Sequence, residues 1–158
     1  KAYGDAYDEY NVPLALIKTS LFGEYNLGLE WKAITPFATV LFIAGVLLAF
    51  AAFAAMLYVL FSKKSALKKE WKLFFGILYA SLFTSYCSFA FGYSNFSAQD
   101  FRYVALVIVV EALFLGLFVD GLDFKEKGQR IYGIIIIGAA GIFAASSCIV
   151  YLMLGFAR

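Results

Sequence analysis

Four long apolar runs, separated by short polar segments, make up most of the chain. They cover residues 33–62, 73–99, 103–119 and 131–157. Glu111 is the one charged residue within them. A helix needs about 20 residues to cross a bilayer core of about 30 Å. We therefore predict an all-α integral membrane protein with four transmembrane helices, at about residues 34–61, 73–92, 103–120 and 131–157.

The first 33 residues are more polar and contain one apolar stretch. Val12–Phe22 has the pattern of a short amphipathic helix, with Pro13 in the first turn and Gly23 to end it. We expect residues 1–33 to form an outward-facing, extracytoplasmic loop or interfacial helix. The stretch lies either on the membrane surface or against another domain, and the sequence leaves both alternatives open.

Composition supports a membrane protein and removes several other classes. Hydrophobic residues make up 63% of the 158 residues, charged residues 15%, and the mean hydropathy is +0.83. Soluble domains are about 45–50% apolar and about 25% charged. The net charge of +2, without a basic cluster interleaved with aromatic residues, argues against a nucleic-acid partner.

The chemistry available to the chain is also limited. It has no histidine, the commonest general base and metal ligand. Its two cysteines, Cys87 and Cys148, lie far apart in apolar runs and form no CxxC motif, so we read them as small buried apolar residues. We expect no metal site and no cofactor.

The distribution of lysine and arginine predicts the orientation, because cytoplasmic loops are enriched in both. With four spans, segments 63–72 and 120–130 share one side and carry eight basic residues. The N-terminal segment, the 92–102 loop and the C-terminus share the other side and carry five. This places the first side in the cytoplasm and both termini outside it.

Glu111 is the first candidate functional residue. A carboxylate at the bilayer centre costs roughly 2.5–3.5 kcal/mol on insertion scales. Glu111 lies roughly 12 Å along the helix from Tyr103, near the middle of the membrane. We expect it to face the protein interior and to bond a hydroxyl-bearing side chain; the candidates are Ser81, Thr84, Ser85, Ser88, Ser146 and Ser147. It is either a proton or ion relay or a structural acid.

Small residues indicate how two of the predicted helices pack. The last run is rich in them between Gly133 and Ser147, and the first run has an alanine-rich stretch between Ala49 and Ala55. Small residues let helix backbones approach closely in lipid. We therefore expect these two helices to pack together.

The loop before the third run holds the second candidate site. Asp100-Phe101-Arg102-Tyr103 stands at the outer end of that helix. Arginine beside tyrosine is common as an interfacial anchor. The planar guanidinium also binds phosphate oxygens in pairs, and Asp100 is positioned in sequence to orient it.

Two segments resemble a known family. Phe101-Arg102-Tyr103 leading into an aliphatic helix, and the stretch from Leu16 to Tyr25, resemble the C-terminal membrane half of bacterial GT-C-fold glycosyltransferases of the protein mannosyltransferase and aminoarabinose transferase kind. The resemblance implies a polyprenyl-phosphate-linked sugar donor on the outer face of a bacterial cytoplasmic membrane. It also implies that Arg102, Tyr103 and Asp100 lie near the donor phosphate. The family has prolines near positions 106 and 109, where this chain has Leu106 and Val109.

The family's catalytic aspartate has no counterpart here, so no catalytic residue is carried over. We expect the catalytic carboxylate to lie upstream of Lys1, in the rest of a parent chain of which this sequence is a fragment. The expected partners are membrane lipid, the lipid-linked sugar and that upstream chain. Two alternatives stay open: a small four-helix transporter or assembly subunit in which Glu111 is the working residue, and a scaffold bundle without chemistry.

Overall fold

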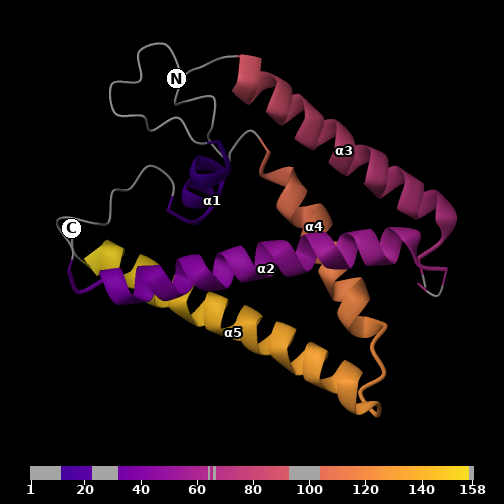
Figure 1. Ribbon diagram of the computed structural model, residues 1–158. Coiled ribbons are helices and arrows are strands. Elements are labelled where there is room, and N and C mark those ends of the chain that lie inside the picture. The colour runs from indigo at the N-terminus through magenta and orange to yellow at the C-terminus, as the bar shows by residue number, and fades with distance from the viewer. Residues whose placement is uncertain (1–11, 23–31, 64, 66, 93–103, 157–158) are drawn as a thin grey trace.

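A computed structural model describes residues 12–22, 32–63, 65, 67–92 and 104–156 (Figure 1). These residues form five helices and no strand, which confirms the predicted all-α class for the part of the chain described. The helices are α1 (Val12–Phe22), α2 (Thr35–Phe61), α3 (Lys69–Gly92), α4 (Leu106–Asp120) and α5 (Lys127–Phe156).

Three of these helices, α2, α3 and α5, are long and apolar enough to cross a membrane. Helix α4 has 15 residues, or about 22 Å at the usual rise per residue. That is shorter than a bilayer core of about 30 Å. Helices α2, α3, α4 and α5 therefore lie at the four positions predicted for transmembrane helices. Only α2, α3 and α5 among them are long enough to cross the bilayer core.

Helix boundaries differ from the prediction at the charged ends. Helix α3 begins at Lys69 and α5 at Lys127, each four residues before the predicted span. Lysine is a good helix former, so helices extend beyond the apolar run into polar surroundings. Helix α2 begins at Thr35 with Pro36 in its first turn, where the missing proline N–H would have no helical partner anyway.

Helix α2 lies at the centre and contacts the other four helices. It runs antiparallel to α5, because the start of α2 packs on the end of α5 in one apolar cluster: Ile34, Ala38, Leu41 and Val150. The two helices diverge toward the other end of α2, where α4 crosses it (Figure 1). A second cluster at that crossing consists of Met56, Val59, Val110 and Phe114.

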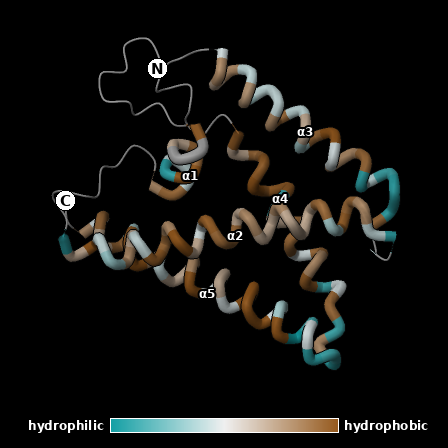
Figure 2. Tube along the Cα trace, viewed as in Figure 1, coloured by the Kyte–Doolittle hydropathy of each residue, from teal (hydrophilic) through white to brown (hydrophobic). Residues whose placement is uncertain are grey.

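The two lysine-containing connections lie at one end of the bundle. Tyr58, in the last turn of α2, makes an edge-to-face ring contact with Phe118, in the last turn of α4, with centroids 5.4 Å apart. The α2–α3 and α4–α5 connections begin just after these residues. We call the end formed by residues 62–72 and 120–130 the basic end. Figure 2 shows hydrophilic residues gathered at both connections, with mostly apolar helices between them.

Helix α1 occupies the residues predicted for it and packs on this chain's own helices. Val12 and Leu21 are buried, whereas Lys18 is exposed. The hydroxyl of Tyr151 on α5 donates a hydrogen bond of 2.5 Å to the carbonyl oxygen of Leu21. The chain's own bundle therefore supplies the packing surface that the sequence had left open.

Helices α2 and α5 pack together as expected, but the small residues are used differently. A Cβ atom added at Gly138 or Gly141 would meet nothing within 4 Å. At Gly45 it would lie 2.9 Å from Cδ1 of Leu21, and at Gly133 it would lie 2.7 Å from Cζ of Phe124. The Cβ atom added at Gly45 would also lie 3.3 Å from Cε2 of Phe143 on α5. The close approaches therefore involve α1 and α5 against α2, and the α4–α5 connection against α5.

Candidate functional site

The polar pair formed by Tyr79 and Glu111 joins α3 to α4. The Tyr79 hydroxyl donates a hydrogen bond of 2.8 Å to Oε1 of Glu111. Both side chains are half-buried. A carboxylate oxygen that accepts this bond loses less on leaving water than an unpartnered one. Tyr79 therefore supplies a hydrogen-bond donor to Glu111, the acid that the sequence places within an apolar run.

Aromatic and aliphatic side chains surround this pair. The ring of Tyr79 lies 6.0 Å from that of Phe83 in a stacked arrangement, and 6.3 Å from that of Phe53 on α2. Tyr79 also packs between the cluster at the α2–α4 crossing and a third apolar cluster near the other end of α3. Helices α2, α3 and α4 thus meet around the hydrogen-bonded pair Tyr79–Glu111.

Tyr79 is a residue that the sequence interpretation missed. The hydroxyls expected to bond Glu111 were serines and a threonine, and four of those, Ser81, Thr84, Ser85 and Ser88, are exposed. A helical stripe on α3 was the signal for Tyr79. The half-buried or buried residues Phe75, Tyr79, Leu82, Tyr86 and Ala90 follow one another at spacings of three or four. Such spacing defines one helix face.

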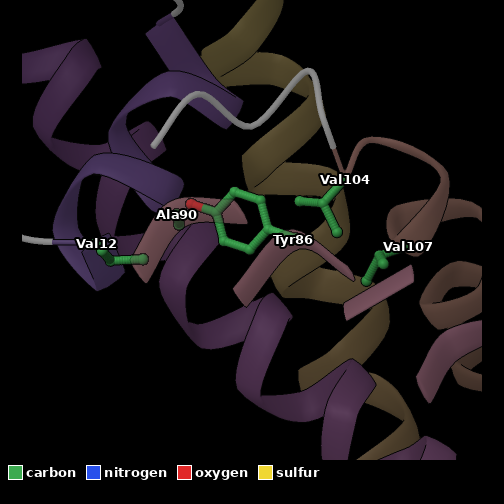
Figure 3. Close-up of a cluster of buried hydrophobic side chains, with 5 residues drawn as sticks. All are labelled: Val12, Tyr86, Ala90, Val104 and Val107. Atoms are coloured by element: carbon green, nitrogen blue, oxygen red, sulfur yellow. The ribbon is translucent and has the colours of Figure 1, made fainter. Parts of the chain in front are cut away.

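The third apolar cluster, which we call the α1–α3–α4 junction, lies opposite the basic end. It contains Val12 from α1, Tyr86 and Ala90 from the last turns of α3, and Val104 and Val107 at the start of α4 (Figure 3). Leu16 of α1 packs against it. The junction brings the start of α1 together with segments that lie far along the chain, at the end of α3 and the start of α4.

The candidate phosphate-binding residues Asp100, Arg102 and Tyr103 lie outside the described residues. The structure does describe their nearest neighbour along the chain. Val104 follows Tyr103 directly, is 2% exposed and lies in the α1–α3–α4 junction. The position where α4 begins is therefore anchored against α1 and α3.

In the part of the chain that the structure describes, no three His, Cys, Asp or Glu side chains lie close enough together to hold a metal ion. Cys87 is half-buried and Cys148 is exposed; both are free thiols. The exposure of Cys148 differs from the buried position expected for it, since α5 turns this face away from the bundle.

No model of a known protein family, no curated protein and no solved structure matches this chain. Its function is therefore inferred from its residues and their geometry.

Proposed function

We propose that α4 is a fourth membrane span. Helix α3 leaves the basic end and is long enough to cross a membrane. Helix α4 ends at the basic end, where Phe118 contacts Tyr58. A chain that crosses with α3 and returns to the same end has to cross a second time. The segment available for this return is the apolar run from Tyr103 to Val119.

We further propose that this chain is the C-terminal membrane portion of a glycosyltransferase, with its catalytic carboxylate outside these residues. The enzyme takes its sugar from a polyprenyl-phosphate-linked donor at the outer face of the bacterial cytoplasmic membrane. The basic end faces the cytoplasm, because cytoplasmic loops are rich in lysine and arginine. Both termini and the α1–α3–α4 junction then lie toward the outer face.

One observation carries the glycosyltransferase proposal. Leu16, from one segment that resembles the family, and Val104, two residues after Arg102, lie at one place although they are far apart in the sequence. Leu16 packs against the α1–α3–α4 junction, and Val104 is part of it. The guanidinium group of an arginine presents a planar pair of N–H donors to a phosphate group. Positive charge there stabilises the phosphate as the sugar leaves it.

The test measures sugar transfer by membranes that contain the full-length protein. The substrate is a polyprenyl-phosphate-linked sugar with a labelled sugar. We expect Arg102→Ala to lower the rate by about 100-fold, as for other groups that stabilise developing charge. Arg102→Lys retains the charge and is expected to retain part of the rate.

Arg130→Ala is the matched control, because Arg130 is exposed at the basic end. We expect it to leave the transfer rate unchanged. Equal amounts of each variant in the membrane, measured by immunoblot, separate loss of activity from loss of folding. Unchanged transfer by Arg102→Ala would show that Arg102 does not hold the donor phosphate.

A second candidate function rests on the Tyr79–Glu111 hydrogen bond. A carboxyl group among apolar helices, bonded to a phenol, is suited to carry a proton or bind a cation in a small membrane transporter or assembly subunit. For this function Glu111→Gln abolishes proton-coupled transport in proteoliposomes, because glutamine does not titrate. Normal coupling in this variant excludes the role, and sugar transfer by Glu111→Gln favours the glycosyltransferase.

A further inference from the structure

The α2–α3 connection carries a concentrated positive charge. Between Lys63 and Lys72 the chain has five lysines and one acid, Glu70. The neighbouring α4–α5 connection is different, because residues 120–130 hold three acidic and three basic residues. The two connections lie at the same end of the bundle, so the excess positive charge of that end belongs to the first of them.

Several contacts hold this connection against the bundle. The Lys72 ammonium donates a hydrogen bond of 2.5 Å to the carbonyl oxygen of Ser62, at the end of α2. The backbone N–H of Leu67 donates to Oγ of Ser65 over 3.2 Å. The Leu67 side chain packs on the cluster at the α2–α4 crossing. These contacts place Lys68 and Lys69 at the start of α3, where both side chains are exposed.

Trp71 gives this surface an apolar neighbour at the same level. Its indole is 52% exposed. It stacks on Phe75 with ring centroids 5.9 Å apart, and Phe75 in turn makes an edge-to-face contact with Phe114 on α4. Tryptophan is enriched where the bilayer core meets the headgroups. Trp71 follows Lys68 by three residues and Lys69 by two. This exposed, packed indole in the first turn of α3 therefore marks the depth of the headgroup region.

We propose that Lys68, Lys69 and Trp71 form a binding site for an anionic phospholipid. The two ammonium groups bind the headgroup phosphate, and the positive end of the α3 dipole acts at the same place. The indole packs against the glycerol and upper acyl chain. Each lysine near a negatively charged membrane contributes about fivefold in affinity. This site requires only that α2 and α3 span the membrane, so it is independent of the glycosyltransferase proposal.

The test uses the protein reconstituted into vesicles that contain phosphatidylglycerol and phosphatidylcholine in equal amounts. Only the phosphatidylglycerol is brominated in one preparation, and only the phosphatidylcholine in the other. Bromine quenches a neighbouring indole, and the quenching lost in a Trp71→Phe variant reports the lipid beside Trp71. We expect phosphatidylglycerol to be preferred over phosphatidylcholine by about fivefold or more at this position. The double variant Lys68→Gln/Lys69→Gln should reduce the preference to near one.

Lys125→Gln/Lys127→Gln is the matched control, since it removes two exposed lysines from the neighbouring connection. We expect this variant to keep most of the preference for phosphatidylglycerol. An equal loss of the phosphatidylglycerol preference in both double variants would show that the whole basic end attracts anionic lipid, and would overturn the local site. Equal quenching by the two lipids in the unmodified protein would also overturn it. Circular dichroism of each variant in the same vesicles establishes that the helices are retained.

Discussion

The hydroxyl of Tyr79 donates a hydrogen bond of 2.8 Å to Oε1 of Glu111, and this bond ties α3 to α4. The other contacts between these helices that the structure describes are largely apolar, in the clusters on either side of the pair. Lipid tails are as apolar as leucine, so apolar contacts alone discriminate weakly between helix partners in a membrane. The polar pair therefore specifies how α3 and α4 are aligned.

Replacing Tyr79 by phenylalanine should reduce stability while keeping the ring contacts. The variant loses the hydrogen bond to Glu111 and leaves the carboxyl group without this donor. We expect the free energy of unfolding to fall by about 1 kcal/mol, the scale of interhelical hydrogen bonds in membranes. Unfolding in mixed micelles with increasing sodium dodecyl sulfate measures it. Tyr58→Phe, which retains the edge-to-face contact of Tyr58 with Phe118, is the control, with a change below about 0.5 kcal/mol. Equal effects in both variants would contradict a specific role for the Tyr79 bond.

Replacing Gly133 by alanine should disturb the α4–α5 connection. The added Cβ would lie 2.7 Å from Cζ of Phe124, so the phenyl ring has to move. We expect a loss of about 1 kcal/mol, at the lower end of overpacking effects because Phe124 is partly exposed. Gly138→Ala on the same helix meets nothing within 4 Å and should be neutral or stabilising. In a Phe124→Ala background the Gly133 substitution should have little effect; a persistent loss would exclude the ring contact as its cause.

Replacing Tyr151 by phenylalanine should loosen α1. The Tyr151 hydroxyl bonds the Leu21 carbonyl oxygen near the end of α1, so its removal frees that end from α5. A hydrogen bond of about 1 kcal/mol corresponds to about fivefold faster amide exchange through local opening. Hydrogen–deuterium exchange of residues 12–22 measures this change. Tyr132→Phe, at an exposed position of the same helix, should leave the exchange of α1 as it is.

Labelling of single cysteines from either side of the membrane tests the fourth span. In a background with Cys87 and Cys148 replaced by alanine, a membrane-impermeant maleimide should label Lys63→Cys and Lys125→Cys from the same side. Asp100→Cys should be labelled from the opposite side. Labelling of all three from one side would mean that the chain does not cross between residues 63 and 125.

Local sequence was sufficient to locate the helices. The predicted short helix is α1, and each apolar run overlaps one of the longer helices, because length and apolar content are local properties. The helix starts at Lys69 and Lys127 were missed, since the prediction followed the apolar run and lysine supports a helix outside it. The candidate residues Asp100, Arg102 and Tyr103 lie outside the described residues, so their role as a phosphate site stays a prediction.

The partner of Glu111 depended on which helix faces meet. A charged residue in an apolar run is visible in the sequence, and so is its need for a hydrogen bond. Many hydroxyl-bearing side chains in the second and fourth runs, with Tyr79 among them, were chemically suitable, and the rotation of α3 about its axis selected Tyr79. The glycines show the same limit. Two of them, Gly138 and Gly141, are exposed, whereas Gly45 and Gly133 are tightly packed, and the sequence does not tell the two kinds apart.

The sequence by itself determined that this chain is helical, apolar enough for a membrane and strongly basic between Lys63 and Lys72. These properties follow from side-chain chemistry and spacing along the chain. Only the tertiary structure decided that α1 packs on its own bundle, that Tyr79 bonds Glu111 and that both lysine-containing connections lie at one end. Those relationships depend on helix rotation and crossing, which are determined by the fit of many side chains from distant parts of the chain.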